Sequence, residues 1–212
     1  MFGNLFDFDG PVLRILELIA NLVILSILTV ICMVPVVTFG PAIKALYAVA
    51  LKLVRGHEGY IVKEYFKQFK DNFLKNIPFG LATLVILVII VYNTWFTIAN
   101  RSVLPIFYII ALALLSFFVL CTVLWALPLN ARFINPVFKT YKLAAILVVT
   151  KFGKTLLMLL SWCFIPACVL FVSGNFLPLV VLIETGLSAY LCAKTYDEMF
   201  REYEERITAG RE

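Results

Sequence analysis

Four ionisable or strongly polar side chains lie within or beside stretches that are otherwise apolar, and they are the first candidates for chemistry. Glu184 lies in VLIETGLSAY, while Glu17 and Asn21 lie in ILELIANLVIL and Arg14 directly precedes it. A charged group deep in the hydrocarbon layer costs about 3 kcal/mol on insertion scales, and such residues usually mark an ion or substrate pathway or a polar partner. The sequence therefore suggests a cluster of Glu184, Glu17, Asn21 and Arg14 that binds an ion or a substrate.

The alternative interpretation of these four residues is structural. Glu184 would then be protonated, or paired with Arg14, and would join two helices through a hydrogen bond. We favour this alternative, because a transport pathway normally needs more polar groups than the sequence offers here.

Patterns that would indicate an enzyme are absent from the sequence. His57 is the only histidine, and the five cysteines form no C-x-x-C pair. Neither the phosphate-binding pattern G-x-x-x-x-G-K-[ST] nor the nucleophile pattern G-x-S-x-G occurs. We therefore predict a protein that is not an enzyme, with no catalytic residue, no metal site and no cofactor.

The elements that carry these residues are long and apolar. Of the 212 residues 63% are hydrophobic and 15% are charged, whereas a soluble domain is about half apolar and a quarter charged. A transmembrane helix needs about 20 apolar residues, and the non-alternating runs do not suit a barrel. We predict one all-α domain over residues 1–212, a polytopic transmembrane bundle. Its five spans would cover about residues 12–37, 77–99, 103–127, 155–173 and 176–193.

The cations alternate between the two sides of these spans. Seven lie in residues 38–76, five in 128–154 and four from residue 194 onward, while the two other connections carry one and none. The positive-inside rule places the three cation-rich segments in the cytoplasm, and five spans then place the N-terminus outside. The net charge of +5 thus reflects topology and contact with anionic lipid, and nucleic acid is not an expected partner.

Two cytoplasmic segments predict further helices. Residues 41–55 indicate a loop helix. In residues 60–77 the side chains Val62, Phe66, Phe69, Phe73 and Ile77 recur at helical spacing, which predicts an amphipathic helix at the membrane interface or against a partner. The candidate contact residues are Tyr65, Phe66, Phe69 and Phe73, with Lys63, Lys67 and Lys70. Residues 139–154 predict a second interfacial helix, and the residues after 195 a solvated helix end.

Three segments carry a resemblance to a known family: GPAIKALY (40–47), RGHEGY followed by YFKQFKDNF (55–60 and 65–73), and LPLNARF (127–133). With these segments the chain resembles the YesL family, small bacterial integral membrane proteins built on a domain of unknown function. The resemblance implies no catalytic residues. It implies a bacterial cytoplasmic membrane and a context beside carbohydrate importers of the ATP-binding-cassette type, although the E-A-A pattern of importer permeases is absent.

Two functions follow from these observations. The first is an accessory or regulatory subunit whose basic, aromatic cytoplasmic face contacts an importer permease. For this face, simple docking on membrane lipid is an equally weighted alternative. The second function is a small transporter or channel that acts alone or as a homo-oligomer and depends on Glu184. The sequence leaves the oligomeric state undetermined.

Overall fold

The structure is a computed structural model, and it describes residues 11–56, 59–71, 73–133, 135–172 and 184–199. In these ranges the regular elements are helices, which confirms the predicted all-α class. In chain order they are α1 (Pro11–Met33), the short 3-10 helix η2 (Val36–Thr38), α2 (Phe39–Val54), α3 (Ile61–Lys70), α4 (Phe73–Ala99), α5 (Ile106–Arg132), α6 (Val137–Thr150), α7 (Phe152–Val172) and a further helix at 184–199.

Several of these helices have the length and composition of membrane spans. Four segments qualify: Leu16–Met33, Val36–Val54, Phe73–Ala99 and Ile106–Arg132. Helix α6 and the first part of α7 form a fifth candidate, a broken span whose halves meet at 105°. Within the described residues, the predicted polytopic bundle of about five spans is therefore confirmed.

The candidate spans differ in detail from the predicted ones. Residues 41–55, expected to form a loop helix, make up most of α2, in which 67% of the apolar window is buried. Helix α5 also continues through Pro128, where the third span was expected to end, as far as Arg132. Of the predicted fifth span, only residues 184–193 lie within the described chain.

Helix α2 lies at the centre of the fold, where α1, α3, α4 and α5 all contact it. Small side chains at Ala42, Ala45 and Ala50, each fully buried, let these neighbours approach closely. The closest approach is at Gly40 and Gly80, where a methyl group on Gly40 would come within 2.1 Å of the Asn76 carbonyl oxygen. Only glycine fits this crossing of α2 and α4.

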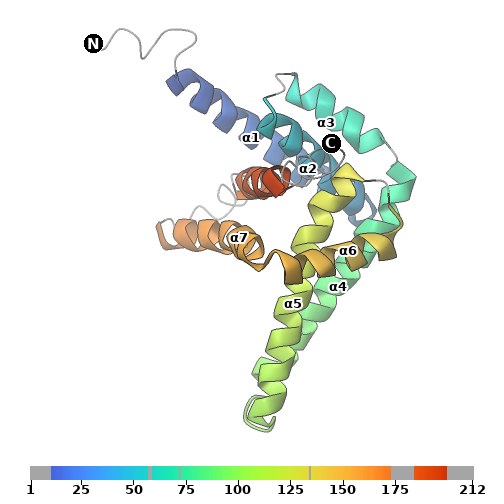
Figure 1. The fold of residues 1–212 in the computed structure, drawn as a ribbon, viewed down its shortest axis with the longest axis vertical. Coiled ribbons are helices and arrows are strands. Elements are labelled where there is room, and N and C mark those ends of the chain that lie inside the picture. Colours follow the sequence, from blue (N-terminus) through green and yellow to red (C-terminus); the bar gives the residue numbers. More distant parts are fainter. Residues whose placement is uncertain (1–10, 57–58, 72, 134, 173–183, 200–212) are drawn as a thin grey trace, which may run out of the picture.

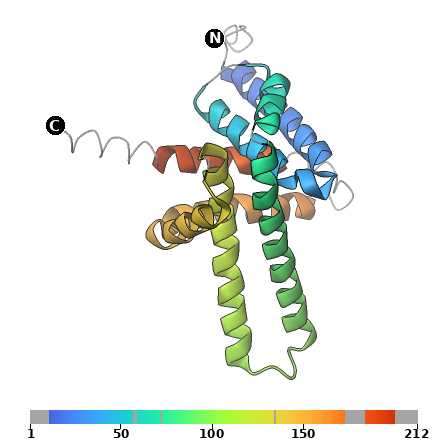
Figure 2. The same cartoon turned by 90° about the vertical axis from the view of Figure 1, so that its right-hand side faces the viewer.

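Helices α4 and α5 form an antiparallel hairpin whose outer half extends away from the other helices (Figures 1 and 2). Its side chains are apolar and exposed, with Val88 at 66% and Leu114 at 64%. In this part of the pair, Asn93 Nδ2 of α4 donates a hydrogen bond to Ser116 Oγ of α5 over 3.2 Å. Apolar surface of this extent is expected where a protein faces lipid tails.

Helices α6 and α7 and the helix at 184–199 lie across the inner half of this hairpin (Figure 2). The Trp125 indole N–H of α5 donates to Thr155 Oγ1 of α7 over 2.8 Å, and the Tyr196 ring packs 6.3 Å from that of Trp125. The helix at 184–199 also crosses α1, where the Gly186 N–H donates to Ser26 Oγ over 2.8 Å. The helix at 184–199 is therefore packed against both α1 and α5.

Candidate functional site

Helix α3 uses one side to pack against the protein. Ile61 and Tyr65 are buried, with Tyr65 fully so, and Phe69 packs on the same core. These residues recur every four positions and thus form one ridge, which faces α1 and α2. Tyr65, predicted as a contact for a partner, therefore contacts the chain's own core instead. Its burial raises the pKa of the phenol, which keeps the hydroxyl neutral.

The flank of α3 beside this ridge stays exposed. An α-helix turns about 100° per residue, so Val62 and Phe66 lie next to the buried ridge. The fractional exposures of these two side chains are 46% and 41%. Lys63, Lys67 and Lys70 follow around the helix and are also exposed. Of the other predicted contact residues, Phe73 is half-buried at the start of α4 and stacks edge-on against Phe69. The exposed surface is thus an apolar strip beside a basic strip; we call Val62, Phe66, Lys63, Lys67 and Lys70 the α3 flank.

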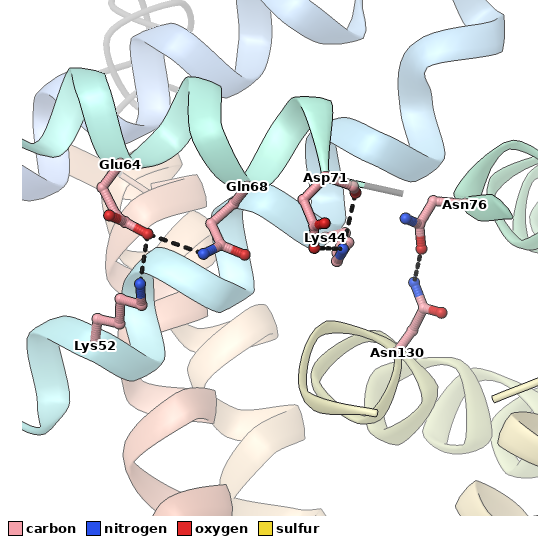
Figure 3. A network of polar contacts seen from close by, with 7 residues as sticks. All are labelled: Lys44, Lys52, Glu64, Gln68, Asp71, Asn76 and Asn130. Atoms are coloured by element: carbon pink, nitrogen blue, oxygen red, sulfur yellow. Dashed lines mark hydrogen bonds and ion pairs between the residues drawn. The ribbon is translucent and has the colours of Figure 1, made fainter. Parts of the chain in front are cut away.

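Polar side chains at the other edge of the buried ridge, away from the α3 flank, fix α3 to α2 (Figure 3). The Lys52 ammonium of α2 forms an ion pair with the Glu64 carboxylate, and Gln68 Nε2 donates to the same carboxylate oxygen over 2.9 Å. The hydrogen bond from Gln68 and the contact with Lys52 lower the pKa of Glu64 from its usual value near 4.5. The carboxylate is therefore ionised at neutral pH and holds both partners.

The end of α3 is held by a second ion pair (Figure 3). Lys44 has a side chain only 5% exposed, and its Nζ lies 3.0 Å from the Asp71 carboxylate. The same ammonium donates to the Asp71 backbone carbonyl over 2.9 Å. A cation at the C-terminal end of a helix satisfies free carbonyl groups and the helix dipole. Lys44 thus fixes the junction between α3 and α4.

A buried amide pair lies one helical turn beyond this junction. Asn130 Nδ2 of α5 donates to Asn76 Oδ1 of α4 over 3.2 Å (Figure 3). Asn130, Lys44 and Asp71 belong to the three segments on which the YesL resemblance rests. Segments far apart in the sequence therefore meet in one polar layer around the start of α4.

The predicted intramembrane cluster is only partly brought together. Glu17 and Asn21 line the same pocket, of about 650 Å³, with Tyr60 and Tyr190. Glu184 is half-buried at the start of the helix at 184–199 and does not line this pocket. Arg14 lies in α1, but its side chain is outside the described part of the structure. A binding role for the four residues stays a prediction.

The sequence analysis missed a cluster of ion pairs around Asp197, in the last described helix. The Asp197 carboxylate, 9% exposed, accepts hydrogen bonds from Arg55 Nη2 and Nε over 2.6 Å and 2.8 Å. Arg132 Nη1 lies 3.8 Å from the same oxygen. The residues after 195 were expected to form a solvated helix end, whereas Tyr196, Asp197 and Met199 are buried. Their spacing, with apolar residues three and four positions apart, was the available signal. His57 lies outside the described residues.

Comparison with known proteins gives one family model, which matches part of the chain. Residues 19–94, which run from α1 through most of α4, match the family model described as "Protein of unknown function, DUF624". No curated protein and no solved structure matches the chain. The matched region contains the Gly40–Gly80 crossing and all of α3. Residues 19–94 are therefore similar to DUF624, and this match bears out the resemblance to the YesL family, because YesL proteins are a DUF624 family.

Proposed function

We propose that this membrane protein is a non-enzymatic interaction protein, an accessory or regulatory subunit that presents the α3 flank to a membrane partner. The observation that carries the proposal is the division of α3 into a packed ridge and an exposed flank. Polar contacts at Glu64 and Asp71 hold the helix in place. A helix that is already ordered loses little conformational entropy on binding, which favours affinity. Phe66 supplies an aromatic anchor, and the lysines supply charge complementarity.

The partner follows from the YesL resemblance alone. It is a permease subunit of a carbohydrate importer of the ATP-binding-cassette type, in a bacterial cytoplasmic membrane. Helix α3 and the C-terminus would then lie in the cytoplasm, as the positive-inside rule predicts.

The test is mild-detergent co-purification from native membranes after crosslinking. We expect importer subunits in near-stoichiometric amount, crosslinked to residues 60–76, and their loss when Lys63, Lys67 and Lys70 are all changed to Glu. The matched control changes Lys139, Lys142 and Lys194, three other exposed lysines, to Glu and should retain the partner. Recovery of the protein alone, with normal membrane insertion, would show that the α3 flank only contacts lipid.

The side on which the N-terminus lies separates two topologies. Five spans predict an external N-terminus, but the α1–α2 hairpin brings Glu17 and Asn21 beside Gly56 and Tyr60 in one pocket. This neighbourhood favours an N-terminus on the same side as α3. The substitution Asn21→Cys, made in a variant whose native cysteines are changed to Ser, distinguishes the two topologies. An impermeant thiol reagent labels it in intact cells only if this end of α1 faces outward.

The pocket at Glu17 and Asn21 supports a second candidate function, a small transporter or channel. A pocket of about 650 Å³ is within the size range of small-molecule sites. Purified protein in liposomes would then conduct an ion or small solute, and Glu17→Gln or Glu184→Gln would abolish the flux. Flux that is unchanged in both variants would remove these carboxylates from any pathway.

A further inference from the structure

A groove between the outer halves of α4 and α5 contains the polar pair Asn93 and Ser116. Its volume is about 180 Å³, and each of the two helices lines one side of it. The side chains at its rim are Ile89 of α4 and Leu115 of α5, with fractional exposures of 59% and 57%. One face of the hairpin therefore carries an apolar hole and, directly beside it, two exposed apolar side chains. This face lies on the part of the hairpin that extends away from the other helices (Figure 2).

The amide of Asn93 has hydrogen-bonding groups that the described chain does not use. An asparagine amide has two N–H donors and one oxygen acceptor, and Asn93 gives one N–H to Ser116 Oγ. Within the described residues, its second N–H and its Oδ1 form no hydrogen bond. The nearby hydroxyls of Thr94 and Thr97, in contrast, donate to carbonyl oxygens of their own helix over 2.8 Å each. A second molecule can therefore still satisfy Asn93.

The depth of this pair in the hairpin makes the unused amide groups unfavourable. Helix α5 begins at Ile106, which places Ser116 about 15 Å along the helix axis. This is near the middle of a hydrocarbon layer about 30 Å thick. Lipid tails offer no hydrogen-bond donor or acceptor there, whereas a polar side chain of another helix does. The occupant that suits this face brings a polar group to Asn93 and apolar groups to the groove.

We propose that this occupant is a second copy of the chain, and that two copies pair through this face of their hairpins about a two-fold axis. An amide is both donor and acceptor, so the two Asn93 side chains satisfy one another across the axis. A two-fold interface uses the same patch on both copies, so Ile89 and Leu115 of each copy pack into the groove of the other. Val88 lies about 140° around α4 from Asn93 and stays in contact with lipid. The pairing does not involve the α3 flank.

The first test measures association in lipid. The purified full-length chain, labelled at its N-terminus with a donor or an acceptor dye, is reconstituted in phosphatidylcholine liposomes at falling protein-to-lipid ratios, and energy transfer is followed. We expect a dimer, and Asn93→Leu should weaken it about 3- to 30-fold, the usual effect of an interhelical hydrogen bond in membranes. The matched control is Thr94→Val, because the Thr94 hydroxyl bonds within its own helix. This control should associate as the wild type does.

Crosslinking locates the interface without any change at Asn93. In a chain whose native cysteines are changed to Ser, Leu115→Cys should be linked between copies in membranes by a short thiol-to-thiol reagent. Leu114→Cys is the control: this position is 64% exposed but lies about 100° further around α5, so it should not be linked. A monomer at every protein-to-lipid ratio would overturn the proposal and leave lipid, or a helix of another protein, on this face. A dimer that Asn93→Leu leaves unchanged, or equal crosslinking at the two positions, would overturn it as well.

Discussion

Helix α2 and the outer half of the α4–α5 hairpin are both apolar enough to cross a membrane, yet they have opposite surroundings. In α2, 67% of the apolar window is buried inside the protein, against 22% for α4 and 17% for α5. Helix α2 is rich in alanine and has Gly40 at its start, whereas the hairpin is rich in valine, isoleucine and leucine. Helix α2 also has the lower mean hydropathy. Smaller side chains and lower hydropathy together therefore distinguish the helix packed inside the protein from the hairpin whose apolar surface is exposed.

This difference predicts where the chain tolerates change. A gap or a clash in α2 must be absorbed by close-packed helices. The same change in the hairpin meets lipid tails, which rearrange freely. The hairpin should instead be sensitive to charge, because lipid offers no polar partner.

The largest effect is expected at the crossing of α2 and α4. Gly40→Ala would bring a methyl group to 2.1 Å from the Asn76 carbonyl oxygen, so the helices must separate at a cost above about 3 kcal/mol. The matched control is Gly153→Ala in α7, where no atom lies within 4 Å of the added methyl group. This control should be neutral or stabilising by up to about 1 kcal/mol. Thermal unfolding followed by size-exclusion chromatography compares them, and equal melting temperatures would contradict the close crossing.

A charge in the outer hairpin should have the next largest effect. Val88 is 66% exposed and lies near the middle of α4, where an arginine costs about 3 kcal/mol of insertion free energy. Val88→Arg should therefore reduce the fraction of the chain that resists alkaline extraction from membranes, while Val88→Leu should leave it unchanged. Full resistance of the arginine variant would mean that this part of the hairpin is not in lipid.

Changing one valine to alanine in α2 and one in the hairpin isolates the contribution of packing to stability. Val49 in α2 is 1% exposed, and Val49→Ala would leave a cavity worth about 2 kcal/mol of stability. Val88→Ala should change stability by less than about 0.5 kcal/mol, as at other exposed positions. Both variants can be measured by unfolding in the same detergent. A similar loss in the two would show that the hairpin, too, is covered by protein, for instance by a second copy.

The smallest effect concerns the contact between α2 and α3. The pKa of Glu64 is lowered in the folded protein, so its contribution to stability is present above pH 4.5 and is lost as the pH falls through the lowered value. The carboxylate is partly exposed, so this contribution is at most about 1 kcal/mol. The difference in melting temperature between the wild type and Glu64→Gln should shrink between pH 6 and pH 3. A difference independent of pH would exclude the ion pair as its source.

The long apolar runs predicted the helical class and most of the spans, because composition alone decides whether a segment can reside in lipid. The surroundings of α2 were not predictable in this way, since Lys44 and Lys52 within residues 41–55 indicated a cytoplasmic loop. In the structure these lysines reach Asp71 and Glu64, which lie 27 and 12 positions later in the chain. Pairing over such distances depends on the tertiary fold and leaves no local pattern.

Within α3, too, the sequence alone could not show which apolar side chains are covered by the rest of the protein. The sequence identified α3 as amphipathic and its lysines as exposed. It did not separate the ridge of Ile61, Tyr65 and Phe69 from the flank at Val62 and Phe66, because the two form one continuous apolar arc. Only the position of α2 decides which part of that arc is covered.

The buried carboxylate of Asp197 has a consequence for biogenesis. Arg132 leaves the ribosome 65 positions ahead of Asp197, and at roughly 5–20 residues per second this separation lasts about 3–13 s. During that interval the ends of α2 and α5 carry like charges without their shared counter-ion. The helix at 184–199 must therefore complete the bundle after the earlier helices have been inserted. Chains that stop short of residue 197 should be open, unfinished intermediates and the preferred substrates of membrane quality control.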